Sequence, residues 1–379
     1  MFDYESLRLI WWALMGVLLI GFALTDGYDM GVAALLPWVA RSDAERRMVI
    51  NTVGPHWEGH QVWFITGGGA IFAAWPFVYA VSFSGFYLAM FVVLASLILR
   101  PVGFKYRSKR DDKAWRTRWD YALFVGGFVP VLVFGVAVGN VLSGAPFRLD
   151  SDLRSFYEGS FFGLFTPFTL LCGLLSLAML VLHGSAWITL RVERGPVHAR
   201  AKLFGMIAGL ASIVLFAAGW AFVAFTNLGY RIVSTVDPLG QSNPLRTISE
   251  PFAGAWLANY GTHPWMVVAP VLGFAGAVLA LFGIGRNSEA LAFTGSSLST
   301  VGIIATVGLS MFPYILPSSI DVHSSLTVWN ASSTAKTLGI MVFVTVILLP
   351  IVLAYTSWAM KVMWGRVTSE DVRTNVDFY

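Results

Sequence analysis

Apolar runs recur along the whole 379-residue chain and constrain its fold more than any other feature. Each run has about 20 residues, which is long enough for a helix to cross a hydrocarbon core of about 30 Å. The strands of a membrane barrel would instead alternate in polarity over short segments, and these runs do not. Only 12% of the residues are charged, whereas a soluble domain has about 25%. The sequence therefore predicts an all-α integral membrane protein.

The apolar runs predict about nine membrane-spanning helices. An eight-helix alternative leaves 29–79 as one loop, but 62–78 (VWFITGGGAIFAAWPFV) is too apolar for a loop in water, and Pro55 suits the first turn of a helix. We expect residues 1–379 to form a single transmembrane domain, built as two four-helix bundles plus one peripheral helix. The expected spans are 7–38, 52–76, 79–103, 121–142, 162–190, 203–226, 264–284, 289–311 and 338–360.

The distribution of basic residues predicts how these helices are oriented in the membrane. With a periplasmic N-terminus and a cytoplasmic C-terminus, the inner connections and the tail hold about 18 of the 25 Lys and Arg residues, and the outer side holds about six. The net charge of +4 is explained by the basic residues of the inner connections, so it gives no reason to expect nucleic acid as a partner. The outer side receives the longer connections, which are 143–161, 227–263 and 312–337.

The polar acidic sites inside the expected spans are concentrated in 20–105. Asp26 and Asp29, in TDGYDM, lie three residues apart and share one face of a helix that continues across Gly27. Two neighbouring carboxylates in a low dielectric cannot both ionise cheaply, which makes them candidates for a proton relay. The alternative is that the span ends near Gly27 and leaves both acids in the inner headgroup zone.

Two further charged residues lie at the ends of expected spans. Glu58 follows Pro55 by three residues, where the positive end of a helix favours an anion, so it is either a structural residue or the point of proton uptake. Arg100 ends the span 79–103. The favoured interpretation is that it snorkels to the inner surface, and the alternative is that it neutralises the acids of the first span.

His56 and His60 lie four residues apart, a spacing that suits metal or haem ligation. Because His183 is the other histidine well inside an expected span, hydrogen bonding at a helix interface is the favoured role for the pair, and ligation is the weaker alternative. The single cysteine, Cys172, excludes an intrachain disulfide and a thiolate metal site. The sequence contains no phosphate loop, nucleophile elbow or His-Glu-x-x-His motif, so we expect no catalytic residue in this chain.

Several sequence blocks resemble subunit II of the cytochrome bd-type quinol oxidases, and the resemblance extends from Phe2 to the C-terminal tail. It implies a nine-helix, multi-pass subunit of a bacterial inner membrane. It also implies pairing with the haem-bearing subunit I, often joined by a small single-helix subunit. The blocks are FDYESLRLIWW, TDGYDMGV, RRMVINTVGPHWEGHQVW, FAAWPFVYAVSFSGFY, RPVGFKYRSK, SNPL, MFPYILPSS, SSLTVWNASS and MWGR.

The same resemblance implies which cofactors and residues matter. Haems b and d belong to subunit I, so this chain is expected to bind no cofactor directly, although some members hold a quinone in a groove that faces the lipid. Carried over by position, the membrane acids of the family fall on Asp26, Asp29 and Glu58, with Arg100 as the associated base. Position 58 is Asp in some relatives. His60 is often Asn, and the resemblance assigns no effect to that departure.

We therefore expect a haem-free subunit of an oxidase that takes electrons from quinol and reduces oxygen to water. Its role would be to stabilise subunit I and to supply part of a proton path. Two rivals remain. A proton-coupled secondary transporter also needs acids inside the membrane. A purely structural assembly subunit would use the same acids only to hold the complex together.

Overall fold

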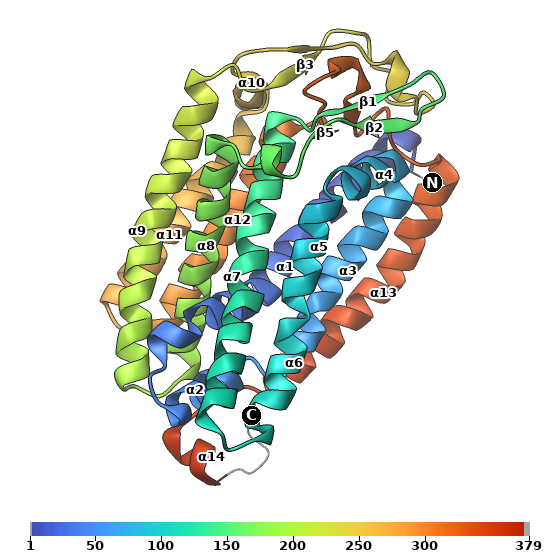
Figure 1. Ribbon diagram of the computed structural model, residues 1–379. Helices are drawn as coiled ribbons and strands as arrows, with labels where there is room; N and C mark the ends of the chain where they lie inside the picture. Colours follow the sequence, from blue (N-terminus) through green and yellow to red (C-terminus); the bar gives the residue numbers. More distant parts are fainter. Residues whose placement is uncertain (1, 375–379) are drawn as a thin grey trace.

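The computed structural model describes residues 2–374, whose long helices run between two opposite ends of the molecule (Figure 1). Eight helical segments in this part of the chain are long and apolar enough to cross a membrane, which confirms the predicted all-α membrane fold. They are α1 (Tyr4–Val39), α5 to η1 (Tyr87–Lys109), α7 (Lys113–Ser143), α8 (Pro167–Arg191), α9 (Pro196–Phe225), η4 with α11 (Pro264–Gly285), α12 (Glu289–Met311) and α13 (Ala335–Val362).

One further long helix, α3 (Trp57–Ala74), lies where the sequence predicted the span 52–76. It packs along α1 and contacts α13, and it runs beside the spanning helices in Figure 1. It is not among the eight apolar segments, because Glu58, His60 and Gln61 make its first turns polar. The count of nine membrane crossings therefore stays a prediction.

The expected span 79–103 is divided into consecutive helices. Trp75 separates α3 from α4, and Pro76 occupies the first turn of α4, where a proline costs no helix hydrogen bond. The chain then returns toward the other end through α5 and α6, which meet at Ile98. These elements are α4 (Pro76–Gly85), α5 (Tyr87–Leu97), α6 (Leu99–Tyr106) and the 3-10 turn η1 (Arg107–Lys109).

The helices form two groups around α1. In one group α8 contacts α9 and α12, and α11 (Val268–Gly285) packs on α9 and α12. In the other group α1 contacts α3 and α7, and α7 also contacts α5 and α6. Helix α1 joins the groups because it packs on α8 as well as on α7, and α13 lies outside against α1 and α3. The acids of α1 therefore lie at the centre of the molecule rather than on its surface.

Short antiparallel strand pairs occupy the end of the molecule that holds the N-terminus (Figure 1). The Asn330 amide donates to the Thr247 hydroxyl at 3.0 Å, and the Tyr314 hydroxyl donates to Ser249 at 2.8 Å, so these connections brace one another. The pairs are β1 (Phe147–Leu149) with β2 (Ser155–Tyr157), β3 (Tyr230–Ile232) with β4 (Ser249–Pro251), and β5 (Tyr314–Leu316) with β6 (Leu326–Thr327). The short helices here are η2 (Phe162–Leu164), η3 (Pro244–Arg246), α10 (Ala255–Thr262), η4 (Pro264–Val267) and η5 (Val322–Ser324).

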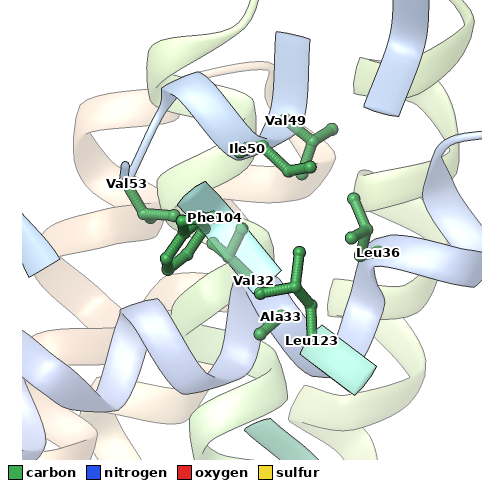
Figure 2. A pocket seen from close by; sticks show the side chains of 8 residues that line it. All are labelled: Val32, Ala33, Leu36, Val49, Ile50, Val53, Phe104 and Leu123. Carbon is green, nitrogen blue, oxygen red and sulfur yellow. The ribbon is translucent and has the colours of Figure 1, made fainter. Parts of the chain in front are cut away.

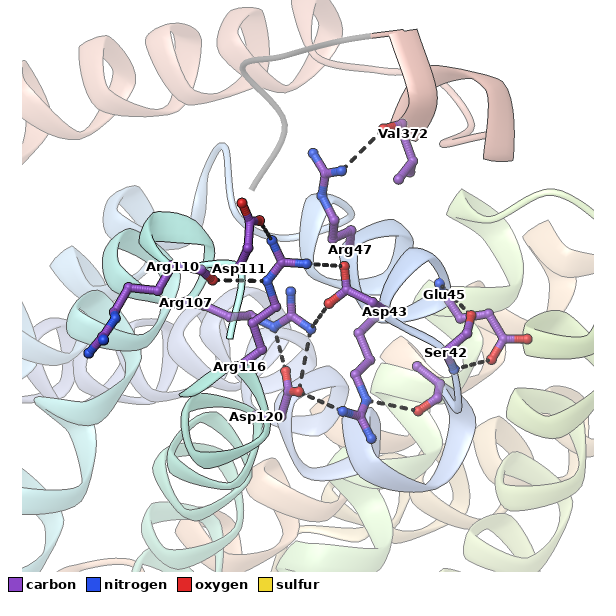
Figure 3. Close-up of polar contacts among 12 residues, drawn as sticks. Ser42, Asp43, Glu45, Arg47, Arg107, Arg110, Asp111, Arg116, Asp120 and Val372 are labelled. Atoms are coloured by element: carbon purple, nitrogen blue, oxygen red, sulfur yellow. Dashed lines mark hydrogen bonds and ion pairs between the residues drawn. The ribbon is translucent and has the colours of Figure 1, made fainter. Parts of the chain in front are cut away.

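An ion network ties the opposite end together (Figure 3). The buried guanidinium of Arg107 donates to Asp120 at 2.5 Å and to Asp43 at 2.8 Å. Arg46 adds a 2.8 Å bond to Asp120, and Arg116 adds a 2.9 Å bond to Asp43. The network joins η1 and α7 to the short helix that follows α1. The two short helices at this end are α2 (Asp43–Asn51) and α14 (Ser369–Thr374).

Figure 2 shows a small apolar pocket that is lined by residues of α1, α2, α6 and α7 and of the turn after α2. Its α1 residues follow Asp29 by one to two helical turns, and its α7 residue, Leu123, lies one turn beyond Asp120. The pocket is lined by Val32, Ala33, Leu36, Val49, Ile50, Val53, Phe104 and Leu123. This apolar layer separates the acids from the charged end of the molecule.

Candidate functional site

Helix α1 continues without interruption across Gly27 and ends at Val39, so Gly27 does not end the helix. Where α1 leaves the membrane stays a prediction. Asp26 is 1% exposed, and both of its carboxylate oxygens accept from the Nη2 atom of Arg100, at 2.8 and 2.9 Å. Arg100 is likewise 1% exposed. The favoured snorkelling interpretation of Arg100 is therefore wrong, because its guanidinium turns inward and pairs with the Asp26 carboxylate.

Asp29 has a different partner on a different helix. Its Oδ2 atom lies 2.6 Å from the Nδ1 atom of His60 on α3, and both side chains are buried. The Tyr28 hydroxyl lies 3.4 Å from the other ring nitrogen of His60. Tyr28 is in turn stacked on the Trp187 ring of α8, with ring centroids 4.1 Å apart. The two acids of α1 thus reach separate basic groups, one supplied by α6 and the other by α3.

His56 lies beside this pair, at the start of α3. Its Nε2 atom is 3.1 Å from the carbonyl oxygen of Thr52, and its ring centroid is 4.9 Å from that of His60. Asp29, His56 and His60 each offer one metal-binding atom, and these three atoms lie within 4.8 Å of one another. Sequence spacing suggested His56 and His60 as a candidate ligand pair, and the fold adds the Asp29 carboxylate to them.

His183 does not join this group of ligand atoms. Its Nδ1 atom lies 2.9 Å from the Ser296 hydroxyl, and its Nε2 atom lies 3.1 Å from the carbonyl oxygen of Leu24. Both ring nitrogens are therefore used in hydrogen bonds between helices. This is the interface role that histidines inside a span usually take.

The structure does not bring Glu58 together with the acids of α1. Glu58 is exposed, and it has no hydrogen bond or ion pair with any residue in 2–374. It precedes His60 by two residues, and side chains two apart on a helix point to opposite sides. Because His60 faces α1, Glu58 faces away from it. Glu58 is therefore exposed on the outer side of α3.

Several atoms of the buried cluster have hydrogen-bonding capacity left over. Within residues 2–374, no partner is found for Asp29 Oδ1, for His56 Nδ1, or for the Nε and Nη1 atoms of Arg100. Buried polar atoms are nearly always paired, so this concentration marks the cluster as unusual. Such a site is suited to taking up a proton or a cation.

Sequence reasoning missed the residues that complete the cluster. Tyr28, Thr52 and Trp187 hold the two histidines through ring stacking and hydrogen bonds. Tyr28 lies between the two acids in TDGYDM, which was a usable signal. Nothing in the sequence pointed to Thr52 or Trp187, because their roles depend on how α8 packs against α1.

The chain matches a known family over residues 7–363, and the family is described as cytochrome bd terminal oxidase subunit II. The chain belongs to this family. It is 48% identical to cytochrome bd-I ubiquinol oxidase subunit 2 of Escherichia coli K12 over 375 residues, which cover 99% of each chain. It is 31% identical to cytochrome bd ubiquinol oxidase subunit 2 of Bacillus subtilis, over 97% of this chain and 99% of the relative.

A solved structure supports the same fold. The bd oxidase from Geobacillus thermodenitrificans contains a chain that aligns with a TM-score of 0.62, covering 94% of this chain and 98% of that one, at 14% identity. That likeness concerns the fold alone. Together with the apolar helices, family membership makes this chain a multi-pass protein of a bacterial inner membrane and a subunit of an oxidoreductase complex. The transporter alternative is not favoured.

Proposed function

We propose that this chain is the haem-free subunit II of an oxidase that transfers electrons from quinol to oxygen, and that it contributes to proton delivery for water formation. The full-length similarity to ubiquinol oxidase subunits supports the reaction. Haems b and d would lie in the partner subunit I, which this chain would stabilise, and a small single-helix subunit, lipid and quinone would complete its surroundings. Nine crossings, with a periplasmic N-terminus and a cytoplasmic C-terminus, complete the proposal.

The packing around the histidines supports the haem-free assignment. The rings of His56 and His60 lie 4.9 Å apart, and the stacked pair of Tyr28 and Trp187 lies against them. Haem bound between two axial ligands needs a flat slot between the ligand atoms. Because these rings already pack against one another and share Asp29 as a neighbour, they do not frame such a slot.

The observation that carries the proton role is the 2.6 Å contact between Asp29 and His60. A carboxylate and an imidazole at this distance exchange a proton with little movement of heavy atoms, and imidazole changes its charge near neutral pH. Asp26 plays a supporting part in this relay. Its two bonds to Arg100 give the buried guanidinium a carboxylate partner, and removing that partner would leave a buried charge uncompensated.

The position of the apolar layer supports proton uptake at the start of α3. The pocket of Figure 2 lies between Asp29 and the charged end formed by α2 and α7, and its lining offers no polar side chain. The first turn of α3 instead carries the exposed Glu58. We therefore place Glu58 at the uptake point, from which protons reach His60 on the inner side of α3 and then Asp29 on α1.

This role is tested by measuring oxygen consumption per haem in purified complexes that carry Asp29→Asn or Glu58→Gln. Both changes remove a proton-exchanging group while keeping the size of the side chain. We expect turnover to fall by about tenfold or more while haem content stays unchanged, as is typical when a positioned acid or base is lost. The matched control is Glu370→Gln, which removes a carboxylate from the exposed helix α14.

Two outcomes would contradict the relay. Normal turnover in fully assembled Asp29→Asn and Glu58→Gln complexes would exclude these groups from proton delivery. Loss of haem with unchanged turnover per remaining haem would instead favour the purely structural alternative, in which the acids only hold the complex together.

A further inference from the structure

We propose that Asp29, His56 and His60 form a binding site for a divalent transition-metal cation, with zinc as the best fit. Their three ligand atoms lie within 4.8 Å of one another. Atoms bound to one tetrahedral zinc lie about 3.3 Å apart, because each zinc bond is about 2.0 Å long. The side chains would therefore need to move by about an ångström or less. Within residues 2–374, no other group of three such residues meets the same distance.

Two atoms of the cluster are free to bind a metal, one on His56 and one on Asp29. The Nε2 atom of His56 lies 3.1 Å from the carbonyl oxygen of Thr52, so it carries the proton and donates. The Nδ1 atom then holds a lone pair, and it has no partner among the described residues. A histidine held by a backbone carbonyl in this way is the usual arrangement of a metal ligand. Asp29 Oδ1 is also without a partner in 2–374.

The type of donor indicates which metal fits. Two imidazoles and one carboxylate are the donor set of many zinc sites, and they also suit other first-row transition metals. Magnesium and calcium prefer sites built from oxygen atoms, and this cluster offers a single carboxylate. Asp26 is neutralised by Arg100, so Asp29 is the carboxylate whose charge is left to balance the cation.

The site is buried but close to the surface. His56 is 8% exposed, and its neighbours Pro55 and Glu58 are exposed at the start of α3. A hydrated cation can therefore reach the histidines past Glu58 without crossing the core. Binding requires neutral imidazoles and an ionised carboxylate, so a proton shared between Asp29 and His60 would leave as the metal arrives.

An occupied site would also affect the relay, a consequence that rests on the proposed function. The metal would hold Asp29 ionised and would use a lone pair of His60, so neither could exchange a proton. We therefore expect added Zn²⁺ to slow oxygen consumption by the wild-type complex, and to slow it less in a complex that lacks His56.

Zinc content tests the site directly. The purified complex is stripped with a chelator, equilibrated with Zn²⁺, desalted, and analysed for zinc per haem by mass spectrometry. We expect the wild type to hold about one zinc more per complex than His56→Gln or His60→Asn. The control is His263→Gln, because His263 is exposed at the C-terminal end of α10, and its loss should leave zinc content unchanged.

Haem content shows whether each variant assembles. If His56→Gln fails to assemble, His60→Asn still tests the site, because its amide can donate a hydrogen bond to Asp29. Equal zinc content in His60→Asn, His263→Gln and wild type would overturn the site. So would a wild-type complex that retains no zinc. Zinc binding that depends on His56 but leaves turnover unchanged would keep the site and contradict the relay through Asp29, so the two proposals can fail separately.

Discussion

Replacement of Arg100 by Met should leave almost no assembled oxidase in the membrane. Met fills a similar volume but leaves Asp26 as a buried carboxylate that has lost both of its hydrogen bonds to Arg100. Breaking a buried ion pair by removing one partner costs about 3–5 kcal/mol, a large fraction of the stability of a typical fold. Assembly is measured as haem content per milligram of membrane protein, together with the size of the solubilised complex.

The double variant Asp26→Asn with Arg100→Met separates this explanation from a simple loss of packing. It removes both charges, so no uncompensated charge remains, and we expect assembly to recover substantially. The comparison variant is Arg154→Met, whose side chain is 71% exposed and pairs with Asp152, because an exposed pair contributes little. Normal assembly of Arg100→Met alone, or no recovery in the double variant, would contradict a neutralising role for Arg100.

The contrast between Arg100 and its neighbours shows how far the sequence could lead. The spacing of Asp26 and Asp29 predicted that both acids share one face of a helix, and the continuous α1 agrees with it. Their partners could not be predicted in the same way. Arg100 and His60 come from two different helices, and which base meets which acid depends on how α6 and α3 pack around α1.

Glu58 illustrates a second limit of the sequence. The sequence left open whether Glu58 is a structural residue or the point of proton uptake, and α3 does pack along α1. The rotation of α3 about its own axis decides the outcome, since it turns His60 inward and Glu58 outward. Beyond Gln61 the helix is apolar on all sides, so hydrophobic periodicity could not fix that rotation.

The divided span 79–103 has a similar cause. Hydropathy shows that a segment is apolar, but it does not show where the chain changes direction. The sequence therefore predicted one helix where the structure has α4, α5 and α6. The local signals were Pro76 and Gly85. Gly85 lies against the Tyr157 ring of β2, where an added Cβ atom would come within 2.4 Å, so the need for glycine there becomes visible only in the fold.

Gly31→Ala should likewise disrupt assembly, because α1 and α8 approach too closely at this residue to admit a side chain. A Cβ atom at Gly31 would lie 2.0 Å from the backbone oxygen of Leu180, and one at Gly184 would lie 2.5 Å from the backbone of Gly31. Backbone atoms cannot rotate away, so the helices would have to separate. Overpacking a core costs about 1–3 kcal/mol even where side chains can adjust. We expect a loss of assembled complex and a shorter half-life of oxidase activity on heating.

Gly16→Ala is the matched control, because it lies in the same helix and an added Cβ would meet nothing within 4 Å. Alanine there should be neutral or slightly stabilising, since it favours a helix by about 1 kcal/mol over glycine. Gly184→Ala, on the facing helix, should behave like Gly31→Ala. Equal assembly of all three variants would show that this contact does not hold α1 in place. A selective loss at Gly31 and Gly184 would show that assembly depends on the close packing of α1 on α8.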